Sequence, residues 1–136
     1  MDLVLAKGEF SFSPDATGTA VSTSKDTDLS MADRITRAAR NSGVDASLAR
    51  KIAFCESSMR QFDTKTGEVV RGIRNPSDIG LFQINEKYHL TRSRELGFDI
   101  HTTEGNIAYA LYLLKQEGSR HWNWSKPCWS DPTLAI

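Results

Sequence analysis

One glutamate occupies a position where the surrounding pattern calls for an apolar side chain. Glu56 lies four residues after Ile52 and eight residues after Leu48. In a helix this spacing places the carboxylate on or beside the face that those residues bury, and Met59 extends that face. A carboxyl group in an apolar wall has a raised pKa, because desolvation disfavours the anion, and a raised pKa suits a general acid. The alternative is a rim glutamate whose stem lies along apolar surface while its head stays in water.

Local signals predict the helices that would position this carboxyl group. Ser30 opens a first helix with a capping-box pattern, and Gly43 ends it. Asp45 caps the second helix, which carries Glu56. The clearest helix opens at Thr103, has apolar residues at helical spacing and is ended by a glycine at 118.

The middle of the chain has a different pattern. Glycines and a proline between Phe62 and Ser77 predict a hairpin or an excursion from the core. The segment 80–85 is compatible with a short strand or with the start of a helix. If it is extended, Gln83 and Asn85 share one side and face a cleft, while the apolar residues between them face a core. A short helix is expected over Thr91–Leu96.

Three motifs occur in an order typical of a known superfamily. They are Cys-Glu-Ser at 55–57, Gly-Leu-Phe-Gln-Ile-Asn at 80–85 and Asn-Ile-Ala-Tyr-Ala-Leu-Tyr-Leu at 106–113. From about Leu29 to Trp129, the chain resembles the soluble lytic transglycosylase (SLT) type of the lysozyme-like superfamily. The resemblance implies a mainly α, lysozyme-like α+β fold, with a small β-hairpin region beside the cleft. We expect a flexible polar leader at 1–29, the lysozyme-like domain at 30–130 and a tail at 131–136.

The resemblance also implies a reaction. Glu56 would protonate the β-1,4 glycosidic oxygen between N-acetylmuramic acid and N-acetylglucosamine in peptidoglycan, and would then accept a proton from the attacking hydroxyl. In a transglycosylase that hydroxyl belongs to the sugar itself, and the product is a 1,6-anhydro sugar. The expected substrate contacts are Ser57, Gln83, Asn85 and Tyr109, whose hydroxyl could touch Glu56 if its helix faces the site; core packing is its other role.

The chain departs from the transglycosylase pattern at Asp78. Lysozymes of the hen type carry their second carboxylate at the corresponding place, so a hydrolase that uses Glu56 and Asp78 is an alternative. In a second interpretation, Asp78 only bonds the backbone of the turn around Pro76. Asp63 is a weaker candidate for the second acid. A non-catalytic glycan-binding accessory module is a further alternative, because fold does not imply function.

Length, charge and apolar content limit the number of domains and the classes of partner. The 136 residues fit one domain, and the net charge of zero argues against nucleic acid as a partner. No apolar run is long enough for a membrane span, and the first residues do not form a signal peptide. We expect a monomer that binds peptidoglycan glycan strands. The three tryptophans, at 122, 124 and 129, are expected to cover the core rather than line the cleft.

The chain has two cysteines, and whether they pair bears on the compartment in which the protein acts. Cys55 and Cys128 are compatible with one disulfide or with two buried thiols. A disulfide would imply an oxidising, extracytoplasmic compartment. The three histidines have no metal-ligand spacing, so we expect no metal and no cofactor.

Overall fold

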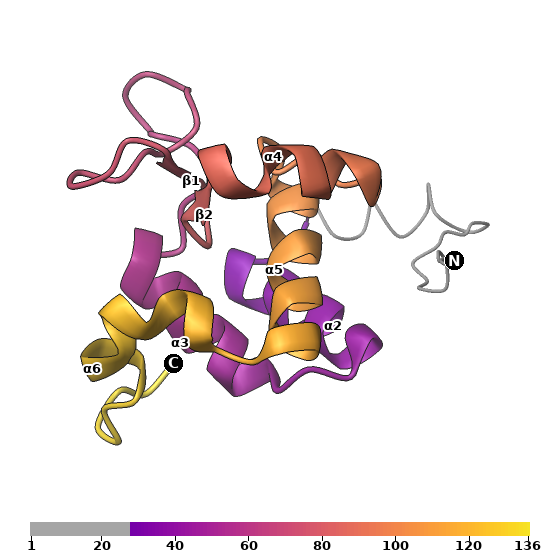
Figure 1. The fold of residues 1–136 in the computed structure, drawn as a ribbon. Helices are drawn as coiled ribbons and strands as arrows, with labels where there is room; N and C mark the ends of the chain where they lie inside the picture. Colours follow the sequence, from indigo (N-terminus) through magenta and orange to yellow (C-terminus); the bar gives the residue numbers. More distant parts are fainter. Residues whose placement is uncertain (1–27) are drawn as a thin grey trace.

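The computed structural model describes residues 28–136, so the predicted leader lies almost entirely outside the described residues. Within the described part the protein is mainly helical and has one two-stranded antiparallel sheet. The long helix α5 (Thr103–Glu117) runs through the middle. Helix α4 (Glu86–Glu95) crosses one end of α5, and α2 (Met31–Ser42) and α3 (Ala46–Ser57) lie towards its other end (Figure 1).

Local capping explains the two helices before the sheet. The Ser30 hydroxyl oxygen accepts the Asp33 N–H at 3.1 Å and begins α2, and Gly43, with φ 73°, ends it. The Asp45 carboxylate accepts the Leu48 N–H at 3.1 Å and begins α3. These predicted helix boundaries are confirmed, because each depends on bonds between residues close in sequence.

The end of α3 differs from the prediction. The helix ends at Ser57, and Ser58 and Met59 have φ values of 56° and 65°. Met59 therefore does not continue the helical stripe, although it packs, partly buried, against the core. The sequence offers no glycine here that would have indicated a left-handed helix cap.

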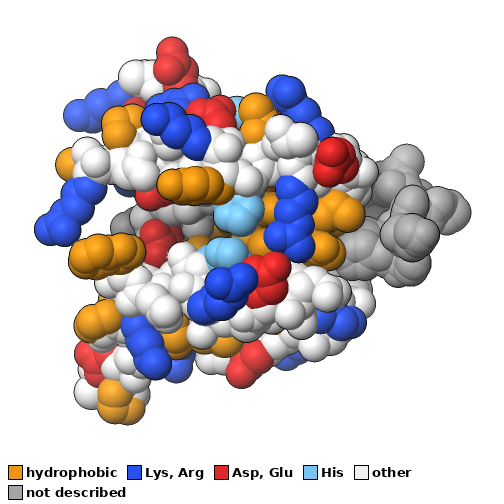
Figure 2. Space-filling model, in the orientation of Figure 1, with side chains coloured by type: hydrophobic (Ala, Val, Ile, Leu, Met, Phe, Trp, Pro, Cys, Tyr) orange, Lys and Arg blue, Asp and Glu red, His pale blue; other side chains and the backbone are white. Residues whose placement is uncertain are grey.

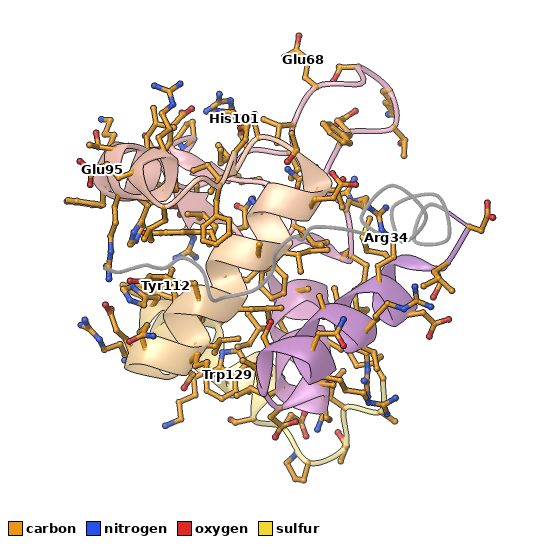
Figure 3. The ribbon with its side chains drawn as sticks, turned by 90° about the vertical axis from the view of Figure 1, so that its right-hand side faces the viewer. Arg34, Glu68, Glu95, His101, Tyr112 and Trp129 are labelled. Carbon is orange, nitrogen blue, oxygen red and sulfur yellow. A yellow bond between two sulfur atoms is a disulfide. The ribbon has the colours of Figure 1, made fainter. Side chains whose placement is uncertain are left out.

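The sheet pairs β1 (Asp78–Ile79) with β2 (Ile84–Asn85). The segment 80–85, which the sequence left open between a short strand and the start of a helix, is a turn over 80–83, where Gln83 has φ 51°, followed by the two residues of β2. The excursion over 62–77 is confirmed only as an irregular segment with an isolated bridge between Phe62 and Val69. Figure 3 shows Glu68 at the outer tip of this excursion.

Helix α4 begins at Glu86, five residues before the predicted start. Asn85 Oδ1 accepts the Tyr88 N–H at 3.1 Å and caps the helix. Only Ser93 of α4 is buried, so the helix carries no apolar periodicity that could have revealed its first turn.

The C-terminal part packs on α3. The 3₁₀ segment η1 (Arg120–Ser125) and the short α6 (Lys126–Trp129) follow α5, and both contact α3. Trp122 and Trp129 are buried as expected, and their indole N–H groups donate to the carbonyl oxygens of Phe82 and Trp122. Trp124 was expected in the core but is 93% exposed, because η1 turns this side chain away from the core.

The largest fully buried apolar side chains belong to Ile35, Ile52, Ile79, Leu81, Phe82, Ile100, Tyr109, Leu111 and Leu113.

Candidate active site

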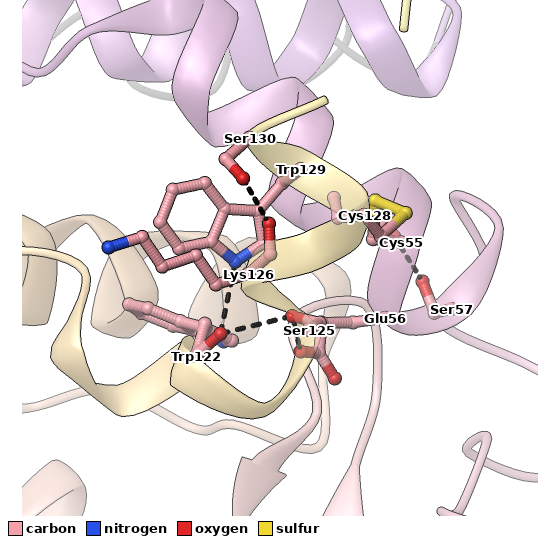
Figure 4. The surroundings of a disulfide bond; sticks show 10 residues. Cys55, Glu56, Ser57, Trp122, Ser125, Lys126, Cys128, Trp129 and Ser130 are labelled. Atoms are coloured by element: carbon pink, nitrogen blue, oxygen red, sulfur yellow. Dashed lines mark hydrogen bonds between the residues drawn. A yellow bond between two sulfur atoms is a disulfide. The ribbon is translucent and has the colours of Figure 1, made fainter. Parts of the chain in front are cut away.

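Glu56 lies in the last turn of α3, beside the disulfide between Cys55 and Cys128. Its side chain is half-buried and reaches the end of η1, where the Ser125 hydroxyl donates to Glu56 Oε2 at 2.5 Å (Figure 4). The bond joins residues that are 69 positions apart. A helix end and a disulfide-tethered segment therefore fix the carboxyl group from two sides.

The surroundings of Glu56 favour its neutral form. Burial raises the pKa of Glu56 most, and the negative charge of Asp78 raises it further. The hydrogen bond from Ser125 opposes both effects because it stabilises the anion, but the pKa remains above the usual value for glutamate. A carboxyl group of this kind can deliver a proton and, once ionised, take one back.

Asp78 belongs to the same electrostatic site. It lies in β1 opposite Asn85 in β2, and Asn85 Nδ2 donates to Asp78 Oδ1 at 3.0 Å. The backbone around it does form the expected turn, since the Asp78 N–H donates to the Asn75 carbonyl at 3.0 Å. The Asp78 carboxylate takes no part in that backbone bond, and its negative charge lies close enough to raise the pKa of Glu56.

A hollow in the surface lies between the parts of the molecule that carry these acids. Figure 2 shows it between the side with α4 and the sheet and the side with η1 and α6, with an acidic side chain visible inside. Histidine side chains lie next to the hollow in the same view. His89 of α4 and His121 of η1 contact each other, with ring centroids 5.4 Å apart. The hollow is thus formed by elements from both halves of the fold.

Two buried amides hold the turn between the strands. Gln61 Oε1 accepts the Leu81 N–H at 2.8 Å, and Asn106 Oδ1 accepts the Phe82 N–H at 2.9 Å. A Cβ atom on Gly80, which has φ 76°, would lie 2.4 Å from Asn106 Nδ2, so only glycine fits. The motif 80–85 is therefore anchored to α5 and to the segment after α3, and this anchoring fixes the strand that carries Asp78.

The predicted substrate contacts lie in different surroundings. Ser57 is buried, and its hydroxyl lies 2.7 Å from the Leu81 carbonyl oxygen that it can donate to. Gln83 is half-buried, and its amide donates to the Gly80 carbonyl at 3.0 Å. Asn85 uses its amide on Asp78 and on the start of α4. Of these three, Asn85 has a direct bond to a candidate acid.

Tyr109 is buried in α5, and its hydroxyl pairs with His89 Nδ1 at 2.7 Å. The contact with Glu56 that we considered is therefore not made, because the hydroxyl is directed to α4. Burial raises the pKa of Tyr109 to about 12. Burial also lowers the pKa of His89, and the nearby His121 and Arg92 add to that effect.

Asp63 has a local role. Its carboxylate accepts the N–H groups of Lys65 and Thr66 at 2.8 and 3.0 Å, and these bonds lower its pKa. These are the bonds of a capped turn. Among the residues that the structure describes, no group of histidine, cysteine, aspartate or glutamate side chains could hold a metal ion.

Ser125 is the site residue that the sequence reasoning missed. No spacing or motif in the sequence singles out the Ser125 hydroxyl as a neighbour of Glu56. The cysteine pair could have indicated it, because Cys55 precedes Glu56 and Cys128 follows Ser125 by three residues. Once the disulfide is accepted, residues near Cys128 must lie near the candidate acid.

Comparisons with protein-family models, with curated proteins and with solved structures give no match for this chain.

Proposed function

We propose that the protein is a peptidoglycan lytic transglycosylase with a lysozyme-like fold, which cleaves the β-1,4 bond between N-acetylmuramic acid and N-acetylglucosamine. The observation that carries the proposal is Glu56, a half-buried carboxyl group whose pKa is raised by burial and by the charge of Asp78, and which the Ser125 hydroxyl holds in place. The order of the three sequence motifs supports the choice of substrate.

In the proposed reaction Glu56 begins in its neutral form. It donates its proton to the glycosidic oxygen as the bond to C1 of the muramic acid breaks, and the leaving sugar departs as an alcohol. The Glu56 carboxylate then removes the proton from the C6 hydroxyl of the same muramic acid, and that oxygen bonds to C1. The product carries a 1,6-anhydro ring, and Glu56 is again neutral.

Hydrolysis is a second candidate because of one specific observation. Asp78 acts electrostatically on Glu56 and is oriented by Asn85. A second carboxylate opposite the acid would stabilise positive charge at C1, or bond to it, while water takes the place of the C6 hydroxyl.

Either reaction would occur outside the cytoplasm. The Cys55–Cys128 disulfide is compatible with an oxidising compartment. None of the helices in residues 28–136 is long and apolar enough to cross a membrane.

The central test is the substitution Glu56→Gln. We expect release of soluble fragments from purified peptidoglycan to fall at least about 100-fold, because general acid catalysis contributes factors of about 10² to 10⁴. Glu95→Gln is the matched control, since Glu95 is exposed near the end of α4. Undiminished activity of Glu56→Gln would remove the assignment.

Thermal unfolding shows whether this variant is folded. A raised pKa in the folded state means that Glu56 costs stability as pH rises through its folded pKa, whereas below the unfolded value the carboxyl is neutral in both states. Glu56→Gln should therefore melt at a higher temperature than the wild type at neutral pH and at a similar temperature in acid. A melting temperature at or below the assay temperature would show that the lost activity reflects unfolding.

Mass spectrometry of the products separates the candidates. Anhydro ends indicate transglycosylation, and reducing ends, which are heavier by one water, indicate hydrolysis. Intact strands that nevertheless bind the protein indicate a non-catalytic module.

A further inference from the structure

Two exposed aromatic side chains lie on the elements that form the two sides of the hollow. Trp124 of η1 is 93% exposed, and Tyr88 of α4 is 82% exposed. Among the described residues, they are the exposed large hydrophobic side chains of these two elements. Figure 2 shows large hydrophobic side chains on both edges of the hollow. Most tryptophans in folded proteins are largely buried, so an exposed tryptophan near a candidate site suggests a role in binding.

Each aromatic residue is linked to one of the two acids through a single neighbour. Trp124 directly precedes Ser125, whose hydroxyl bonds to Glu56. The Tyr88 N–H bonds to Asn85 Oδ1, and the same amide donates to Asp78.

Both aromatic residues are close in sequence to a contact between α4 and η1. Tyr88 directly precedes His89, and Trp124 follows His121 by three residues. The rings of His89 and His121 are in contact, so α4 and η1 meet within a few residues of Tyr88 and Trp124 along the chain.

The polar side chains expected to bind sugar are largely engaged within the protein. Ser57 is buried, the Gln83 amide bonds to the backbone, and the Tyr109 hydroxyl pairs with His89. Exposed aromatic rings offer a different kind of contact to a glycan strand, namely stacking on a sugar ring. A pyranose ring has an apolar C–H face that fits a flat aromatic surface, whereas a protein partner usually requires a contiguous apolar patch.

We propose that Trp124 and Tyr88 are the sugar-binding platforms of the hollow, each stacking on one ring of a bound glycan strand. The inference rests on the proposed function for the identity of the strand. It adds the residues that hold the strand while Glu56 acts.

The test measures binding without turnover. The parent protein is the full chain carrying Glu56→Gln, and the probe is a soluble oligosaccharide of alternating N-acetylglucosamine and N-acetylmuramic acid. Calorimetry should give about tenfold weaker binding for Trp124→Ala in this background, and a smaller loss for Tyr88→Ala. Trp124→Phe and Tyr88→Phe keep an aromatic face and should retain most of the affinity. Leu96→Ala, which removes another exposed apolar side chain just after α4, should bind like the parent.

Fluorescence gives a second readout that a purely structural role would not change. Trp122 and Trp129 are buried, so Trp124 should account for the solvent-exposed emission and for acrylamide quenching. Glycan binding should shift the emission to the blue and reduce quenching in the parent, and Trp124→Ala should lack both changes.

The outcomes separate the two proposals. If the parent binds the oligosaccharide and Trp124→Ala binds it equally well, the platform proposal is wrong and the proposed function stands. If the parent binds no oligosaccharide and the wild type releases no fragments from peptidoglycan, both proposals are wrong. Weaker binding by Trp124→Ala with unchanged thermal unfolding supports the platform.

Discussion

The Ser125 hydroxyl has one proton and two acceptors within reach. It lies 2.5 Å from Glu56 Oε2 and 3.2 Å from the Trp122 carbonyl oxygen. When Glu56 is ionised, the hydroxyl donates to it. When Glu56 is neutral, the carboxyl proton can be donated to Ser125, which then donates to Trp122. The serine therefore has a satisfied hydrogen bond in both protonation states that the proposed reaction requires.

This arrangement predicts the pH dependence of Ser125→Ala. General acid catalysis needs neutral Glu56, so activity is lost as pH rises through the Glu56 pKa. The Ser125 hydrogen bond lowers that pKa, and its removal must raise it. The alkaline limb of the pH–rate profile should therefore move to higher pH, while the maximal rate falls about tenfold, the equivalent of one lost hydrogen bond to a charged group.

Ser125→Thr keeps the hydroxyl and is the matched control. If Ser125 only supported the local structure, its removal would lower the rate but leave the alkaline limb of the pH–rate profile at the same pH. An alkaline limb that stays in place, or moves to lower pH, in Ser125→Ala would contradict the role assigned to this residue.

At the scale of elements, the sequence predicts those helices and turns whose stabilising hydrogen bonds join residues close together in the chain. The ends of α2 and the start of α3 are fixed by bonds across three or four residues, and the sequence predicted them. The turn at 80–83 depends on Gln61 and Asn106, whose side chains bond to it from 20 and 24 residues away. No local pattern carries that information, so the sequence left 80–85 open between a strand and the start of a helix and did not indicate the positive φ of Gln83.

The same contacts predict a large effect of Asn106→Ala. Asn106 Oδ1 accepts from Phe82, and its Nδ2 donates to the carbonyl oxygens of Ile79 and Ile100. Truncation leaves these three buried groups without that partner, and each such group costs about 1 to 3 kcal/mol. Urea unfolding should show a loss of about 3 kcal/mol or more. Gln116→Ala, on the exposed side of the same helix, should stay within about 0.5 kcal/mol of the wild type, and a similarly small loss for Asn106→Ala would show that the turn is held by other contacts.

At the scale of the whole molecule, one covalent bond joins the two parts of the candidate site. The sequence left open whether the cysteines pair, because spacing alone cannot bring positions 73 residues apart together. The structure pairs them and packs α6 on α3, and in doing so it brings Ser125 to Glu56. The acid could be proposed from its helix, whereas its partner became visible only in the folded chain.

The double variant Cys55→Ala/Cys128→Ala tests this link. Closing a loop of 73 residues contributes about 4 kcal/mol in the chain-entropy model, so the free energy of unfolding should fall by about that amount. Ser125 lies three residues before Cys128 and Glu56 follows Cys55, so activity should fall even where the variant is fully folded.

The reduced wild type is the matched control and should show the same unfolding midpoint in urea as the variant. Equal stability of the oxidised wild type and the variant would contradict the predicted contribution of the disulfide, and unchanged activity of the variant would contradict its role in holding Ser125 on Glu56.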